Sequence, residues 1–365
     1  MKNKPFRVLS LDGGGIRGLY TASILQRLLN RYGDGNKDLG RGFDLIAGTS
    51  TGGILAMALA SGVPVAKIIQ LYKEAGPRIF TKPAPDTLWA KIRWATTSIG
   101  KPANCNSVLK SELKQIFHEQ TIKDLWDERG IGLCLTSVNL TTHRAQVFKT
   151  PHIENKNADN SRKLVDICLA TSAAPIILPI GQSNDPDDPD RKEYHVDGGL
   201  WANNPILVAL TEAMQLSETS QDIEIISVGT CQNSTGNILD PKKENGGLAY
   251  WNFGIKPLSI SLEAQSHGYL HIAKFLADSL TKHGKNCKVL RLYESSPSAE
   301  QSKHLGLDKA NAQSIKVLLD LASEDARIIN GHINNNNGNY KIIDDIFTNL
   351  KDLPNKEGNH ARSSE

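Results

Sequence analysis

The chain has 365 residues, of which 39% are hydrophobic and 22% are charged, with 30 Gly and 16 Pro. This composition excludes a disordered chain, a collagen and a coiled coil, and the length suits one large α/β domain. The formal net charge of +3 is too close to balance for general nucleic-acid binding, so we expect no nucleic-acid polymer as a partner. The five cysteines are scattered without a C-x-x-C motif, which favours reduced thiols over a disulfide framework or a metal site.

Two N-terminal features bear on membranes. The first residues lack the apolar core and cleavage site of a signal peptide. Residues 45–66 carry no charge and approach the roughly 20 residues that a membrane-spanning helix needs. Their many Gly, Ser and Thr residues suit such a helix poorly, so we expect a buried strand, a tight turn and a buried helix instead.

Short apolar segments alternate with segments of helical periodicity along the chain. Strands are predicted at residues 6–11, 43–47, 131–138, 145–149, 223–228 and 288–292, with one more ending near Asp197. Helices are predicted from about 19 to 33 and at 54–59, 163–170, 207–216, 257–280 and 308–329. This alternation predicts an α/β fold with a largely parallel sheet that helices cover on both faces.

Three segments look like additions to this scaffold. Residues 77–107 are interrupted by prolines and mix basic with aromatic side chains, and residues 184–192 form an acidic loop. Residues 330–339 are rich in asparagine and predict a polar linker. We therefore expect one domain over residues 1–330, followed by a polar linker and C-terminal tail at 331–365.

The first motif is Asp-Gly-Gly-Gly-Ile-Arg-Gly at residues 12–18, between a predicted strand and a predicted helix. Three of its glycines satisfy G-x-G-x-x-G, so a dinucleotide-binding loop is one interpretation, with Asp34 or Asp38 as the ribose-binding acid. Consecutive glycines let backbone N–H groups approach a ligand, and the helix N-terminus favours negative charge. The loop therefore suits a phosphate or a developing oxyanion, and a tight turn without a ligand is the third interpretation.

The second motif is Gly-Thr-Ser-Thr-Gly at residues 48–52, directly after a predicted strand and before a predicted helix. This is the context of a nucleophile elbow, in which Ser50 would be the nucleophile. Gly48 and Gly52 suit the elbow because the chain passes close to itself there, and the helix dipole favours negative charge at the serine. The alternative is a buried turn of small residues without chemistry.

The third motif is Asp197 followed by two glycines at the end of a predicted strand. A conventional serine hydrolase places a histidine after this acid, yet no later histidine lies in a turn after a strand. His267 and His271 share a helical face without the glutamate of H-E-x-x-H, which favours packing over metal binding. His195 shares the strand face of Asp197, but that position does not orient its ring toward the carboxylate, and we expect no catalytic role for it.

Taken together, the three motifs resemble the patatin-like phospholipase family. Ala-Ala-Pro at 173–175 and Ser-Val-Gly-Thr at 227–230 also resemble recurring family segments, and the similarity runs from about residue 6 to about residue 330. The resemblance implies a three-layer α/β/α sandwich with a mainly parallel central sheet. It also implies a serine hydrolase, a phospholipase of the A type, that needs no cofactor.

The resemblance further implies a Ser–Asp dyad without a catalytic histidine, with Ser50 as the nucleophile and Asp197 as the base. Arg17 would support the glycine loop or contact a lipid phosphate. The oxyanion hole would consist of the backbone N–H groups of Gly13, Gly14 and Gly15. A carboxylate is a weak base unless its surroundings raise its pKa, so this mechanism predicts partial burial of Asp197.

Within the family, the short layout resembles bacterial phospholipase effectors of antiphage (CBASS) signalling, which cyclic di- or oligonucleotides activate. This implies a cyclic-nucleotide activator, a phospholipid membrane surface as a peripheral partner, oligomerisation on activation, and a cytoplasmic location at the inner membrane. Residues 77–107 suit a lid at a lipid interface or a nucleotide clamp, and a solvated cap with aromatic side chains packed inward is the alternative. The candidate contacts are Arg78, Lys82, Trp89, Lys91, Arg93, Trp94 and Lys101.

Three classes of protein thus remain for comparison. A patatin-type acyl hydrolase, with or without nucleotide control, accounts for all three motifs and for the missing histidine. A nucleotide-dependent oxidoreductase accounts only for the first motif. A storage or binding protein on the same scaffold would be expected to lack Ser50 or Asp197, and both are present.

Overall fold

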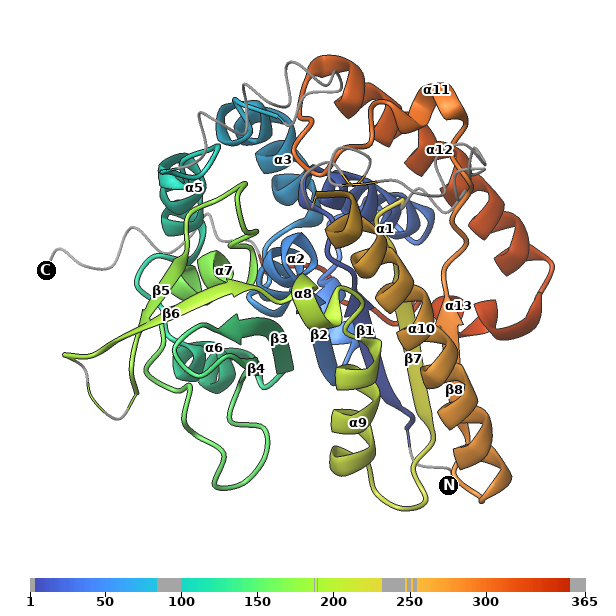
Figure 1. Cartoon of the computed structure of the whole chain (residues 1–365). Coiled ribbons are helices and arrows are strands. Elements are labelled where there is room, and N and C mark those ends of the chain that lie inside the picture. Colours follow the sequence, from blue (N-terminus) through green and yellow to red (C-terminus); the bar gives the residue numbers. More distant parts are fainter. Residues whose placement is uncertain are drawn as a thin grey trace, which may run out of the picture.

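A computed structural model describes residues 4–83, 100–186, 188, 190–231, 247, 251 and 255–354. In this part of the chain eight strands form one sheet in the order β5-β6-β3-β2-β1-β7-β8, with β4 paired to β3 outside this path (Figure 1). The strands are β1 (Phe6–Leu11), β2 (Leu45–Thr49), β3 (Gly132–Asn139), β4 (Arg144–Lys149), β5 (Gly181–Asn184), β6 (Lys192–Asp197), β7 (Ile223–Val228) and β8 (Cys287–Arg291).

The five strands β3, β2, β1, β7 and β8 are parallel, whereas β4, β5 and β6 join by antiparallel pairing. Parallel strands end at the same edge of a sheet, and ligand sites of such folds lie outside this edge. The pairing of β6 with β3 places Asp197 opposite Ser137, close to the edge at which β2 ends. The topology therefore brings the second and third motifs to the same region.

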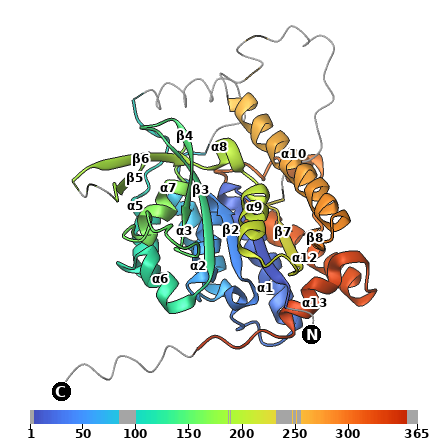
Figure 2. The ribbon, with the colours of Figure 1, turned by 90° about the horizontal axis from the view of Figure 1, so that it is seen from below.

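Two helical layers cover the sheet, and Figure 2 shows α9 and α10 on one side with α1 and α2 on the other. The larger layer shares one hydrophobic core with the sheet. Its helices are α1 (Gly18–Arg31), α2 (Thr51–Ala60), α3 (Val65–Ile79), α5 (Ser107–Phe117), α6 (Ile122–Arg129), α7 (Leu164–Thr171), α12 (Ala312–Asn334) and α13 (Lys341–Phe347). The smaller layer consists of α9 (Ile206–Leu216) and α10 (Ile255–Lys282). The short helices α8 (Gly199–Ala202) and α11 (Ala299–Ser302) complete the fold with the 3-10 turns η1 (Gly15–Arg17), η2 (Leu39–Gly42) and η5 (Gly338–Tyr340).

The central strands divide their side chains between the two layers. Val8 belongs to the α9–α10 core, whereas Leu9 and Leu11 belong to the larger core. Likewise Leu45 and Ala47 face one side, and the intervening isoleucine faces the other. Successive strand residues point to opposite faces, so a strand buried on both faces has an almost continuous apolar sequence. The three-layer α/β/α arrangement expected from the sequence is confirmed.

The uncharged stretch at 45–66 divides as expected into β2, a turn and the buried helix α2. Across the described ranges, no helix has both the length and the apolar character that crossing a bilayer requires. The predicted acidic loop lies between β5 and β6, which pair as a hairpin from Asn184 and Lys192 inward.

The prediction of a polar linker and tail at residues 331–365 is wrong for its first part, which is helical. Helix α12 continues to Asn334 in spite of its polar sequence, and α13 follows after a short turn. Apolar side chains of α13, among them Ile343 and Phe347, are buried in the larger core. The backbone of Asp38 then donates a hydrogen bond to the carbonyl of Lys351. Hydrophobic contacts thus fix this segment to the domain, whereas residues 355–365 of the expected tail lie outside the described part.

Candidate active site

Ser50 occupies a sharp turn between β2 and α2. Its φ of 54° and ψ of −123° are uncommon for a residue with a side chain, and they mark a strained backbone. A Cβ at Gly48 would lie 2.4 Å from the carbonyl oxygen of Gly52, and a Cβ at Gly52 would lie 2.4 Å from that of Leu11. Both glycines are therefore required by close backbone contacts. The Ser50 N–H donates to Thr171 Oγ1 at 2.9 Å, which ties the elbow to α7.

Asp197 ends strand β6 and lies directly beside this serine. The Ser50 hydroxyl donates a hydrogen bond of 2.6 Å to Oδ2 of Asp197, and the Gly199 N–H donates one of 2.7 Å to Oδ1. Burial raises the pKa of Asp197 to about 6, although these hydrogen bonds act in the opposite direction. A glycine is required at position 198, between Asp197 and Gly199, because a Cβ there would lie 2.4 Å from the carbonyl oxygen of Thr136.

The glycine loop after β1 lies next to the serine, but its three glycines differ. The Gly13 N–H donates a hydrogen bond of 2.8 Å to the carbonyl of Asn203, so this group, predicted as an oxyanion donor, is already engaged in the structure. Gly14 and Gly15 line the same cavity as Ser50, and their N–H groups have no hydrogen-bond partner among the described residues. A Cβ at Gly14 would contact Thr230, and Gly15 has a φ of +58°.

The first residue of the loop is held by a strand at the edge of the sheet. Asp12 is fully buried, and its Oδ2 accepts a hydrogen bond of 2.7 Å from Nη2 of Arg291 on β8. Arg291 also bonds Ser227 on β7 and Glu294. Burial raises the pKa of Asp12 to about 6, whereas the Arg291 charge lowers it. The aspartate of the first motif therefore anchors the loop.

Arg17 places a buried cation at the cavity beside these glycines. It is 7% exposed, and its Nε has no hydrogen-bond partner in the described part of the chain. Burial lowers the pKa of this guanidinium, and the charge of Glu263 acts against that shift. Both side chains line the cavity with Ser50. An arginine with a free donor at this place can bind an anionic group of a ligand.

The cavity over Ser50 and Asp197 has a volume of about 320 Å³ and is mainly apolar. Its walls come from α2, α3, α5, α8 and α10, from the segment after α7, and from residues 302–307. The apolar wall residues are Ile54, Leu71, Ile79, Phe80, Leu109, Ala174, Pro175, Ile177, Leu178, Leu200, Leu262, Leu305 and Leu307. A hydrocarbon chain fits this lining, with its polar end at the serine.

Among the other predicted contacts, the three that the structure describes do not line the cavity. Arg78 pairs with Glu112 at 2.8 Å on the surface, and Lys82 and Lys101 are exposed. The remaining candidates of this segment, Trp89, Lys91, Arg93 and Trp94, lie outside the described residues.

The structure also places two residues that the sequence offered as alternatives, His195 as a catalytic histidine and Asp38 as a ribose-binding acid. His195 is fully buried and lies 3.0 Å from Ser183 through Nε2, and burial lowers its pKa to about 4. Neither oxygen of Asp197 bonds it, in line with the expectation that it has no catalytic role. Asp38, a candidate ribose-binding acid, instead binds Nη2 of Arg129 through both oxygens at 2.7 Å, which suits a structural ion pair.

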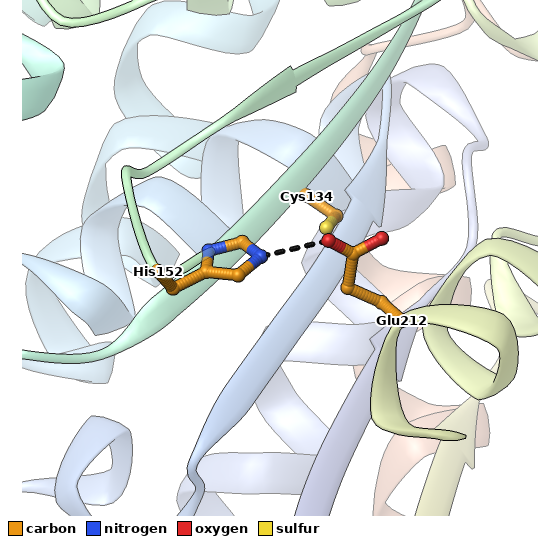
Figure 3. Close-up of side chains that lie close together, drawn as sticks. All are labelled: Cys134, His152 and Glu212. Atoms are coloured by element: carbon orange, nitrogen blue, oxygen red, sulfur yellow. Dashed lines mark hydrogen bonds and ion pairs between the residues drawn. The ribbon is translucent and has the colours of Figure 1, made fainter. Parts of the chain in front are cut away.

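A second cluster of ionisable side chains lies against α9 (Figure 3). Cys134, His152 and Glu212 place one potential metal ligand each within 4.8 Å of the others. Both carboxylate oxygens of Glu212 are already engaged, one by His152 Nε2 at 2.9 Å and the other by Lys149 Nζ at 2.5 Å. Neither carboxylate oxygen is left without a partner. This cluster is therefore interpreted as a closed network of hydrogen bonds and ion pairs.

Sequence reasoning missed three supporting residues. Thr171 holds the elbow N–H, Asn203 accepts from Gly13, and Arg291 anchors Asp12. A polar residue just before the Ala-Ala-Pro segment was a weak signal for Thr171. No sequence signal could identify Arg291, because it is separated from Asp12 by 279 positions.

Comparisons with known proteins place the chain in a family. The model of a family described as patatin-like phospholipase matches residues 9–210. The chain is 34% identical over 264 residues to a cGAMP-activated phospholipase of Pseudomonas aeruginosa, which covers 72% of this chain and 73% of the relative. It is 31% identical over 324 residues to one of Escherichia coli, covering 86% of each. A cGAMP-activated phospholipase of Vibrio cholerae is 32% identical over 332 residues, covering 87% of this chain and 89% of the relative.

Proposed function

Because the chain belongs to the patatin-like phospholipase family, we propose that it releases fatty acids from membrane phospholipids through a Ser50–Asp197 dyad. The observation that carries the proposal is the 2.6 Å hydrogen bond from the Ser50 hydroxyl to the buried carboxylate of Asp197. A serine needs an adjacent base to become a nucleophile, and Asp197 is the base in contact with it.

In the first half-reaction, Ser50 Oγ attacks the carbonyl carbon of the ester while its proton passes to Oδ2 of Asp197. The bond Asp197 makes to Gly199 keeps the carboxylate in place during this transfer. Its raised pKa makes it a stronger base than an exposed aspartate, because a base is most effective when its pKa lies near the working pH.

The negative charge that develops on the carbonyl oxygen is stabilised by the N–H groups of Gly14 and Gly15. Both residues line the cavity with Ser50, and neither N–H has a hydrogen-bond partner among the described residues. Loss of one such donor costs about 10²–10³ in rate in other hydrolases. The N-terminus of α2, which begins directly after Ser50, adds a favourable dipole.

Collapse of the tetrahedral intermediate breaks the bond to the lysophospholipid alcohol, which takes the proton from Asp197 and leaves an acyl-serine. Water then attacks this ester, giving its proton to Asp197, and the free fatty acid leaves as Ser50 regains its proton. The acyl chain occupies the apolar cavity throughout, and the guanidinium of Arg17, which lines the same cavity, binds the phosphate of the headgroup.

We further propose that a cyclic dinucleotide activates the enzyme in bacterial antiphage defence. Three relatives at 31–34% identity are named cGAMP-activated phospholipases, and they align over 72–87% of this chain. If a cyclic dinucleotide activates the enzyme, its activity without this activator is low, and it acts at the surface of the membrane once the activator binds.

The test measures fatty acid released from phosphatidylglycerol and phosphatidylethanolamine vesicles with and without cGAMP. We expect cGAMP to raise the rate and Ser50→Ala to abolish it, with the melting temperature retained. A matched control is Ser61→Ala at the other end of α2, which should keep the wild-type rate. Full release without any nucleotide would remove the activation, whereas release by Ser50→Ala would disprove the dyad.

A further inference from the structure

Large apolar side chains are exposed around the mouth of the cavity. Ile176 is 49% exposed, Ile180 50% and Ile260 47%, and each lies within two residues of a cavity-lining residue. Leu200 on α8 is 38% exposed and itself lines the cavity. We call these four residues the mouth rim. They come from three separate segments, so their convergence is a property of the fold.

The three segments are linked by hydrogen bonds. The Asp197 N–H, just before α8, donates to the carbonyl of Ala173, just before the segment that carries Ile176 and Ile180. At the other end of α8, the Asn203 N–H donates to the side chain of Gln265 on α10, the helix that carries Ile260. The segments that carry the mouth rim are therefore linked to one another beside the site.

Ile176 combines exposure with an unfavourable backbone. Its φ is +72°, a conformation that β-branched residues adopt only at a cost. Asparagine or glycine would fit this position better, and nothing in its burial calls for isoleucine. Strained residues persist where a function needs them, so this observation points to a use for the exposed side chain.

A basic side chain lies next to this apolar border. The Ala103 N–H donates a hydrogen bond of 2.8 Å to the carbonyl of Ile176, which brings residues 101–103 alongside the rim. Lys101, two residues earlier, is exposed. Exposed apolar residues with a neighbouring cation are the combination that binds the surface of an anionic bilayer.

We propose that the mouth rim docks into the surface of an anionic phospholipid bilayer, with Ile176 and Ile180 entering the hydrocarbon boundary and Lys101 at the headgroups. The inference rests on the proposed function, since it gives the acyl chain a path from the bilayer to Ser50 without crossing water. A bilayer is the occupant that fits, because the exposed border continues directly into the apolar walls of the cavity.

Another exposed apolar group offers a matched control. Phe275 on α10 is 68% exposed, and its position 13 residues beyond Leu262 places it about 20 Å along the helix from the cavity. If exposed apolar area alone caused membrane binding, Phe275 would matter as much as the rim.

The experiment measures binding of the full chain to vesicles of phosphatidylethanolamine and phosphatidylglycerol by flotation, with and without cGAMP. All variants carry Ser50→Ala, so that no lipid is consumed. We expect Ile176→Asn with Ile180→Asn to weaken binding at least about tenfold, because each buried isoleucine side chain favours transfer strongly. Phe275→Asn should bind like the parent, and Lys101→Gln should lose severalfold on these vesicles but not on phosphatidylcholine.

Thermal melting separates docking from a structural role. Ile176→Asn should keep or raise the melting temperature, since asparagine tolerates the backbone, whereas a structural isoleucine would lower it. Unchanged binding by the double variant, an equal loss with Phe275→Asn, or a change of oligomer mass caused by the rim variants would overturn the proposal.

A soluble ester distinguishes this proposal from the proposed function. With Ser50 restored, the double rim variant should hydrolyse p-nitrophenyl butyrate at the wild-type rate but release less fatty acid from vesicles. If the wild-type chain cleaves no ester of either kind, the dyad fails, and the flotation result with its controls still decides the docking surface.

Discussion

Two buried carboxylates of this protein have opposite surroundings. Asp197 receives hydrogen bonds from a serine hydroxyl and a backbone N–H, no cation among the described residues is bonded to it, and burial raises its pKa to about 6. Glu212, on the α9 side of the sheet, is paired with Lys149 and His152. Burial alone would raise the pKa of Glu212, but these two partners outweigh it and hold the pKa below its usual value.

The difference separates the carboxylate that we propose as a general base from one held in a closed network of partners. A carboxylate that carries its charge without a counterion binds a proton more readily, which is what a general base requires. A carboxylate whose two oxygens are both satisfied by cationic or imidazole donors has little basicity left to use. Burial by itself therefore does not identify a catalytic carboxylate. The hydrogen-bond and ion-pair partners of the buried group determine whether it can act as a base.

Of the substitutions that test this contrast between Asp197 and Glu212, Asp197→Asn should have the largest effect on activity. Asparagine keeps the shape and can still accept from Gly199, but it cannot take the Ser50 proton, so kcat/KM should fall about 10⁴-fold or more. The folded-state pKa of Asp197 is raised, so its ionisation destabilises the fold as the pH rises through about 6. The variant should therefore melt higher than the wild type at pH 8, and this difference should shrink toward pH 4. A lower melting temperature at pH 8 would contradict an uncompensated charge.

The dependence of kcat/KM on pH should show the titration of Asp197 in the wild-type enzyme. Only ionised Asp197 can accept the serine proton, so kcat/KM on a soluble ester should fall about tenfold per pH unit below about 6. An uncharged ester avoids titration of a lipid headgroup. A profile that stays flat down to pH 4.5 would show that the base has an ordinary pKa.

Glu212→Gln should affect stability instead of chemistry. It removes the charge that pairs with Lys149 and His152, and the free energy of unfolding should fall by about 2 kcal/mol at pH 7 in urea denaturation. The pKa of Glu212 is lowered in the folded state, so this loss should be present above about pH 5 and disappear as the pH falls. The folded variant should keep kcat, and a large loss of kcat would connect this cluster to the active site.

His195→Gln should have the smallest effect on activity. The histidine is neutral because burial lowers its pKa to about 4, and its Nε2 contacts Ser183 instead of the dyad. We expect kcat/KM within a few-fold of the wild type, with some loss of melting temperature from altered packing. A loss comparable with that of Asp197→Asn would require a triad.

The sequence determined the parts of the site whose chemistry lies in neighbouring residues. Gly48, Gly52 and the glycines after Asp197 mark places where the backbone leaves little room for a Cβ, so their spacing predicts the serine and the aspartate that we propose as nucleophile and base. The alternation of short apolar and periodic segments likewise predicted the parallel sheet and its two helical layers, because burial on both faces requires continuous apolar strands.

Only the tertiary structure decided what depends on distant partners. The Gly13 N–H is used by Asn203, so we propose only Gly14 and Gly15 as oxyanion donors, and Arg291 reaches Asp12 from the edge strand β8. The polar end of α12 leads into α13, which packs in the core although its sequence neighbours suggest a linker. The apolar cavity draws on several helices at once. Steric requirements of a turn are local and can be read along the chain, whereas burial and pairing arise only when separate elements meet.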